Sequence, residues 1–235
     1  IKAVVAKTNH RVPVIAGVGC NATERTISFM EKVNDLGVDG MLIVTPYYNK
    51  ATQNGLYEHY RQIAEHTPKP IILYNIPSRT GCNMLPETVA RIADSCPNVT
   101  GIKEASGNIS QVAKLASLVG DRLDIYSGND DQIVPVMSLG GTGVISVLAN
   151  LLPKNIHDIT KEMLNGNYIT AKNAQLAYEK LIEKLFAEVN PIPVKAALHM
   201  MGMDVGPVRL PLTELEETHK IELKRAMSEA GIRSL

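Results

Sequence analysis

The sequence has no excess of charge of either sign, because 24 Lys plus Arg balance 24 Asp plus Glu over 235 residues. A net positive field is what draws a chain to nucleic acid or to an anionic membrane surface, so neither partner is expected. No uninterrupted apolar run approaches the roughly 20 residues that a membrane helix needs. The first residues also lack the basic and then apolar pattern of a secretory leader. These absences predict a soluble protein without a targeting segment.

Cysteine is scarce, and its placement excludes two further classes of protein. Cys20, Cys82 and Cys96 are widely spaced, with no CxxC pair and no histidine at metal-ligand spacing. Such spacing suits the reducing cytoplasm better than a disulfide framework, and it predicts no structural metal. We interpret all three thiols as packing residues.

Apolar runs that resemble buried strands alternate with amphipathic helical segments along most of the chain. Strands alternating with helices predict a parallel sheet, and units of about 30 residues or fewer are typical of a (β/α)8 TIM barrel. Six of the eight units are visible, so either two units precede Ile1 or the sheet is open and doubly wound. The predicted strands span residues 12–17, 40–45, 70–76, 99–105, 123–127 and 143–147.

Helical patterns alone follow the sixth unit, over residues 169–189, 190–203 and 213–230. We therefore predict a partial (β/α)8 barrel that carries the catalytic site over residues 1–165 and a C-terminal helical region over 166–235. The helical region is interpreted as a layer for oligomerisation or for covering the barrel.

Lys103 lies in the middle of a short apolar run that reads as a buried strand. Successive strand residues point to opposite faces, so Glu104 cannot be the near partner of this lysine. An amine in a poorly solvated site loses affinity for its proton, and a neutral amine condenses with a ketone to give a Schiff base. The alternative is a lysine that extends to solvent from an edge strand.

The carboxyl ends of parallel strands carry the active site in α/β folds, and three tyrosines lie there beside Lys103. A phenol can relay a proton, which carbonyl condensations require at several steps. Each tyrosine could instead be a packing aromatic. The three are Tyr47, Tyr48 and Tyr74.

One glycine-rich turn fits a dinucleotide-binding pattern. Residues 17–22 read G-x-G-x-x-A between a predicted strand and a helix capped by Asn21. The acidic residue that should close the next strand is replaced by Thr45 and Pro46, and Asp39 lies at the beginning of that strand. A nicotinamide oxidoreductase therefore stays open only as an alternative.

The strand ends taken together resemble the dihydrodipicolinate synthase family of class I pyruvate-dependent aldolases. The order and spacing of the matching runs cover essentially the whole chain. The resemblance implies a (β/α)8 barrel with a C-terminal helical region, usually assembled as a homotetramer from two tight dimers, and no cofactor or metal. The matching runs are VTPYYN (44–49), LYNIPSRTG (73–81), GIKEASG (101–107), SGND (127–130), GVISV (143–147), NPIPVK (190–195) and RLPL (209–212).

The same resemblance implies a reaction, in which pyruvate condenses with L-aspartate-4-semialdehyde to give 4-hydroxy-tetrahydrodipicolinate in the diaminopimelate and lysine pathway. Lys103 would be the Schiff-base lysine, Tyr74 the proton-relay tyrosine, and Tyr48 a tyrosine that reaches across the dimer interface. Arg79 would bind the carboxylate of the second substrate, because its planar guanidinium can donate two parallel hydrogen bonds to a carboxylate. Gly128 and Ile145 would line the pyruvate pocket, Ile145 through its backbone, and Thr45 is a further predicted substrate-binding residue.

Two departures from the family pattern lead to predictions. The family's Gly-Thr-Thr-Gly-Glu turn belongs to the second unit of the barrel and is absent, so about two more units are expected ahead of Ile1. Lysine-inhibited members carry a glutamate where this chain has Arg25, although Asn21 and Tyr47 match. A cation there would repel the ammonium group of lysine, which predicts weak or no feedback inhibition.

Three other functions stay open beside this one. Related barrels use the same lysine and tyrosine on other aldehydes, as in N-acetylneuraminate lyase and the keto-deoxy-sugar aldolases. The run Ser78-Arg79-Thr80 favours the semialdehyde enzyme. A non-catalytic homologue or fragment that serves only in assembly or ligand binding is the second possibility, and the nicotinamide oxidoreductase considered above is the third.

Overall fold

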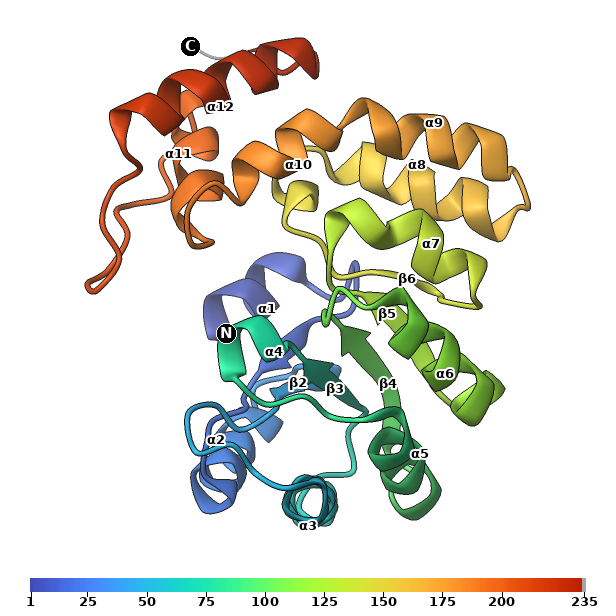
Figure 1. The fold of residues 1–235 in the computed structure, drawn as a ribbon. Helices are drawn as coiled ribbons and strands as arrows, with labels where there is room; N and C mark the ends of the chain where they lie inside the picture. The colour runs from blue at the N-terminus through green and yellow to red at the C-terminus, as the bar shows by residue number, and fades with distance from the viewer. Residues whose placement is uncertain (234–235) are drawn as a thin grey trace. The chain divides into compact units, whose positions relative to one another are not determined.

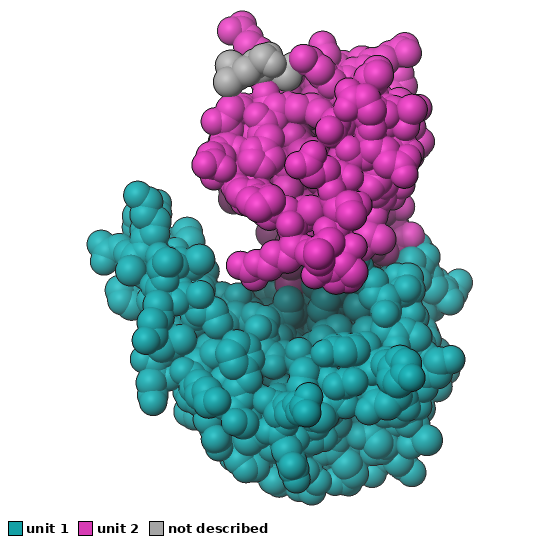
Figure 2. All heavy atoms as spheres, turned by 90° about the vertical axis from the view of Figure 1, so that its left-hand side faces the viewer, with its two compact units in different colours: residues 1–128, 139–142 teal, residues 129–138, 143–235 magenta. Residues whose placement is uncertain are grey.

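The computed structural model describes residues 1–233 and divides into two compact units (Figures 1 and 2). Unit 1 comprises residues 1–128 and 139–142, and unit 2 comprises residues 129–138 and the chain from residue 143 onward. The predicted boundary between residues 165 and 166 rests on where the strand and helix repeat ends, and it stays a prediction. No helix within residues 1–233 is long and apolar enough to cross a membrane.

Five parallel strands form the sheet of unit 1. They are β1 (Ile15–Gly17), β2 (Gly40–Val44), β3 (Ile71–Asn75), β4 (Val99–Glu104) and β5 (Asp124–Ser127).

The strands follow one another in chain order from β1 to β6, where β6 is the short strand Gly143–Val144 of unit 2. A doubly wound sheet reverses its strand order at a switch point, so this order is that of a barrel and the open, doubly wound alternative is wrong. β4 lies between β3 and β5, so Lys103 does not extend from an edge strand.

Two helices of unit 1 begin at residues whose side chains cap them. Thr52 caps α3 by accepting from the backbone N–H of Gly55, and Asn108 caps α6 by accepting from that of Gln111. The predicted cap Asn21 is wrong by one residue, because α2 has Ala22 as its N-cap. The helices are α1 (Lys2–Thr8), α2 (Thr23–Asn34), α3 (Gln53–Ala64), α4 (Pro77–Thr80), α5 (Pro86–Ser95), α6 (Ile109–Val119) and the short 3-10 helix η1 (Gly120–Arg122).

The two faces of the sheet differ in burial, as alternation along a strand requires. One face is fully buried and includes Ile43, Leu73 and Ile102, which are partners in register. The opposite face is half-buried, and its last row holds Val44, Tyr74, Lys103 and Tyr126 in register. Lys103 and its two tyrosine neighbours are therefore presented on the less buried face.

Unit 2 is mostly helical around its own apolar core. That core includes Leu148, Ile159, Leu185 and Leu223, all essentially inaccessible to solvent. The elements are η2 (Asp130–Gln132), α7 (Ile133–Ser138), β6, η3 (Leu148–Asn150), α8 (Pro153–Leu164), α9 (Tyr168–Ala177), α10 (Glu179–Leu185), α11 (Ile192–Met200) and α12 (Glu217–Glu229).

The helix predicted over residues 169–189 is broken at Tyr178, which is the C-cap of α9 and the N-cap of α10. Its hydroxyl accepts a hydrogen bond of 2.6 Å from Asn155 Nδ2 of α8, so a polar contact accompanies the break. The apolar periodicity continues across both helices, which is why the sequence did not reveal the interruption.

Candidate active site

Lys103 and Tyr74 lie together at the carboxyl ends of β4 and β3. They are partners in register, and Lys103 Nζ lies 4.3 Å from the centroid of the Tyr74 ring. Both side chains are half-buried on the same face of the sheet. The structure therefore brings together the amine and the phenol that the sequence analysis named from two separate strands.

The environment of Tyr74 keeps its phenol protonated. Burial raises its pKa above the ordinary value, and the positive charge of Arg79 opposes that shift. A phenol with a raised pKa carries its proton at neutral pH and can donate it to a neighbouring oxygen. Tyr74 thus has the protonation state that a relay to a carbonyl oxygen requires.

Arg79 is held by α4, a single helical turn directly after β3. Pro77 begins this turn, and Gly81 ends it in the left-handed conformation with φ of +69°. The Thr80 hydroxyl donates to the backbone of this turn and accepts 3.3 Å from the hydroxyl of Thr45. Thr45 itself is fully buried, so its hydroxyl ties the end of β2 to the turn that carries Arg79.

Tyr48 projects from a strained loop after β2. Its side chain is 89% exposed and its φ is +74°, an uncommon conformation for a residue other than glycine. The backbone N–H of Tyr48 donates to Thr80 O over 3.2 Å, which joins this loop to α4. A large aromatic group held out from a strained loop is typical of a functional constraint.

Gly128 lies against the end of β4. A Cβ atom at this position would lie 2.5 Å from the Cβ of Ala105, and the Gly128 N–H donates to Glu104 O over 2.8 Å. Only glycine permits so close an approach. Ile145 belongs to unit 2, where it follows β6 and is half-buried. The roles predicted for both in a pyruvate pocket stay predictions.

A buried polar row lies on the opposite face of the sheet, one position beyond Tyr74 and Lys103. It consists of Asn75, Glu104 and Ser127, which are partners in register, and all are at most 3% exposed. Glu104 was not among the predicted site residues, because alternation along the strand points it away from Lys103. The sequence feature that could have pointed to Glu104 is a carboxylate on the strand face that is otherwise apolar and buried.

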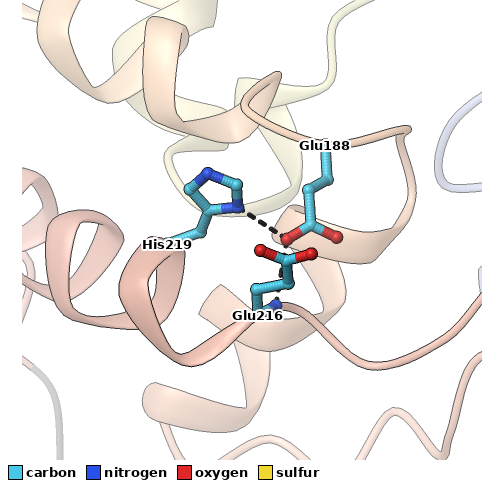
Figure 3. Close-up of side chains that lie close together, drawn as sticks. All are labelled: Glu188, Glu216 and His219. Carbon is cyan, nitrogen blue, oxygen red and sulfur yellow. Dashed lines mark hydrogen bonds and ion pairs between the residues drawn. The ribbon is translucent and has the colours of Figure 1, made fainter.

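Three potential metal ligands meet in unit 2, where Figure 3 shows Glu188, Glu216 and His219 side by side. Glu188 accepts from His219 Nδ1 over 2.7 Å and from the backbone N–H of Glu216 over 2.9 Å. The hydrogen bond to Glu188 raises the pKa of His219, and the same bond lowers the pKa of Glu188. The cluster is thus accounted for by an ion pair and a cap at the start of α12.

Comparison with known proteins identifies the family. The sequence model of the Dihydrodipicolinate synthetase family matches residues 1–230. The chain belongs to this family. It is 55% identical over 232 residues to the 4-hydroxy-tetrahydrodipicolinate synthase of Caldicellulosiruptor saccharolyticus, a match that covers 99% of this chain and 78% of that protein.

Solved structures of the dihydrodipicolinate synthetase family have the same fold as this chain. A dihydrodipicolinate synthase from Acinetobacter baumannii, solved in complex with pyruvate, is 43% identical with a TM-score of 0.95, covering 98% of this chain and 79% of its own. A lysine-bound relative from Cyanidioschyzon merolae is also 43% identical, with a TM-score of 0.93, covering 98% of this chain and 78% of its own. The (β/α)8 class predicted for this chain, with six of its units visible, is confirmed.

Proposed function

We propose that this protein is a lyase that condenses pyruvate with L-aspartate-4-semialdehyde to give 4-hydroxy-tetrahydrodipicolinate, an intermediate of diaminopimelate and lysine biosynthesis. The observation that carries the assignment of the site is the juxtaposition of Lys103 Nζ with the Tyr74 ring at 4.3 Å. The names of the family and of its relatives support the reaction.

The chemistry begins at the amine of Lys103. A neutral amine attacks the keto carbon of pyruvate, and loss of one water gives the imine. Loss of a methyl proton then gives the enamine, whose carbon attacks the aldehyde. The amino group of the semialdehyde finally attacks the imine carbon, which closes the ring and releases Lys103. Every step moves a proton, and Tyr74 is the group placed to carry it.

The other predicted residues bind and orient the substrates in this proposal. Arg79 is exposed on α4 and binds the carboxylate of the semialdehyde with its planar fork. Thr45 orients the turn that carries Arg79, because its buried hydroxyl donates a hydrogen bond to the hydroxyl of Thr80. Gly128 and Ile145 line the pyruvate pocket, and the absence of a side chain at Gly128 lets its backbone approach Ala105 closely.

We further propose a homotetramer built from two tight dimers, in which Tyr48 completes the site of a neighbour. Its exposure of 89% and its φ of +74° support a role outside its own subunit. Free thiols at Cys20, Cys82 and Cys96 support a place in the reducing cytoplasm. The small-molecule substrates are the partners that this site requires.

Borohydride trapping tests the proposed reaction. Pyruvate and borohydride should add one stable adduct to the protein, and peptide mass analysis should place it on Lys103. Lys103→Ala should form none. Condensation should then be faster with aspartate semialdehyde than with sugar-derived aldehydes or with N-acetylmannosamine. Absence of the adduct would contradict the aldolase, and preference for a sugar aldehyde would move the assignment to a related lyase.

Mixing two inactive variants tests the role of Tyr48. In a dimer of Lys103→Ala with Tyr48→Phe, one site would hold both an intact Lys103 and the intact Tyr48 of its neighbour. Activity should therefore return on mixing and subunit exchange. If Tyr48 serves its own subunit, neither site is complete and the mixture stays as inactive as its components.

A further inference from the structure

We propose that Glu104 is a positioning residue, which holds Lys103 and Tyr74 in register from the buried face of the sheet. The inference rests on the proposed function and adds a residue to it. Glu104 does not face the reacting atoms, because it follows Lys103 directly in β4 and points to the other side.

The Glu104 carboxylate is buried and bound by three neutral donors. Its Oε1 accepts from the backbone N–H of Ser106 over 2.7 Å. Its Oε2 accepts from Asn75 Nδ2 over 3.0 Å and from Gln111 Nε2 over a longer 3.5 Å. Burying a carboxylate is costly unless such donors surround it, and leucine or isoleucine would fill this sheet and helix layer without that cost. Apolar packing alone therefore does not explain this residue.

Asn75 extends the contact into a network at the end of β3. Its Nδ2 also donates to Asn83 Oδ1 over 2.9 Å, and its Oδ1 accepts from the backbone N–H of Met84 over 3.0 Å. Asn83 and Gln111 exchange two further hydrogen bonds, of 2.8 and 3.1 Å. The network joins the ends of β3 and β4 to the loop before α5 and to the first turn of α6.

Register makes this network relevant to catalysis. Asn75 pairs with Glu104 one position beyond the pair formed by Tyr74 and Lys103. A directional bond between the outer pair therefore fixes the inner pair, whereas apolar contacts would allow the two strand ends to slide or separate. A displacement of about 1 Å between reacting groups can cost on the order of 100-fold in rate.

The side chains of the network are one carboxylate and several amides, which have similar shapes. The donor and acceptor between positions 104 and 75 can therefore be exchanged by substitution. Glu104→Gln places a donor against the Asn75 donor, and Asn75→Asp places two carboxylates together. In the double variant the amide at position 104 donates to the carboxylate at position 75. Rotation of the Asn83 and Gln111 amides by half a turn then restores the remaining bonds.

The experiment measures kcat and KM for these variants, normalised to the number of sites that borohydride and pyruvate trap at Lys103. Each single variant should lose roughly 10- to 100-fold in kcat, with KM for the semialdehyde within about 2-fold of wild type. The double variant should recover kcat to within about 5-fold of wild type. Glu87→Gln, an exposed change on α5 that breaks only the ion pair with Lys114, should behave as wild type.

A merely structural role would lower the number of trapped sites and leave kcat per site unchanged, and that result would overturn the proposal. So would a double variant no faster than the poorer single. Should the single variants fail to fold, Gln111→Met at the half-buried edge of the network takes their place. Its kcat per trapped site should fall by about 3-fold, and an unchanged kcat would contradict the proposal. A wild type without any Lys103 adduct would instead refute the proposed function itself.

Discussion

Lys103 of β4 lies over the ring of Tyr74 on the neighbouring strand, with Nζ 4.3 Å from the ring centroid. This distance lies within the range in which an ammonium group is attracted to the face of an aromatic ring. The same arrangement places a phenol hydroxyl in the site where the amine must react. The ring and the hydroxyl therefore have separable roles, one in holding the lysine and one in moving protons.

Tyr74→Phe separates these roles, because it retains the ring beside Lys103 and removes only the hydroxyl. We expect the pyruvate adduct to form at Lys103 but kcat to fall by roughly 100- to 10,000-fold, the range for loss of a general acid or base. Single-turnover trapping and steady-state rates measure the two effects. Unchanged turnover would show that Tyr74 only packs against the lysine.

Gly128→Ala should damage the site through β4. The new Cβ atom would lie 2.5 Å from the Cβ of Ala105. Ala105 directly follows the end of β4, two positions after Lys103. We expect a loss of about 1–3 kcal/mol in the free energy of unfolding, together with slower adduct formation. Gly17→Ala is the control, because no atom lies within 4 Å of its Cβ position. Equal stability of the two variants would contradict the close approach.

His59 should make the protein sensitive to mild acid. Burial lowers its pKa from 6.5 to about 4, and its Nδ1 lies 3.0 Å from the Thr23 hydroxyl. The unfolded state therefore binds this proton more tightly than the folded state. The contribution of neutral His59 to the free energy of unfolding is fully present above pH 6.5. It is lost as the pH falls toward 4, which lowers the free energy of unfolding by about 3 kcal/mol.

His59→Gln removes the titrating imidazole and puts a neutral amide in its place. Chemical denaturation between pH 7 and 4 should show a shallower loss of stability in this variant than in wild type. Parallel curves for the two proteins would mean that His59 binds its proton as readily in the folded state as in the unfolded state.

Feedback by lysine should be weak, because Arg25 is exposed on α2. It lies in sequence close to Asn21, whose carbonyl accepts from Asn49 Nδ2 over 2.9 Å and so holds the loop of Tyr47 nearby. Arg25→Glu replaces a repulsive charge with an attractive one and should strengthen inhibition by about 10-fold or more. Arg25→Gln should give an intermediate value in the same lysine titration, and strong inhibition of the wild type would refute the argument.

Local patterns account for much of what could be predicted. The apolar run around Lys103 predicted a buried strand, and the caps at Thr52 and Asn108 mark the starts of α3 and α6. The turn α4 was missed, because the four residues Pro77–Thr80 are too few to show a helical period. The break at Tyr178 was missed for the opposite reason, since the apolar period continues through it.

The sequence by itself determined that strands alternate with helices, that a lysine lies in a buried strand, and that the chain resembles the aldolase family to which it belongs. These properties depend on residues close together in the chain. Only the tertiary structure decided that Lys103 faces Tyr74 and that Glu104 binds Asn75. Both contacts depend on the register between β3 and β4, which is set by hydrogen bonds between residues 29 positions apart. Such pairing leaves no period in the sequence, because it arises only when the strands align.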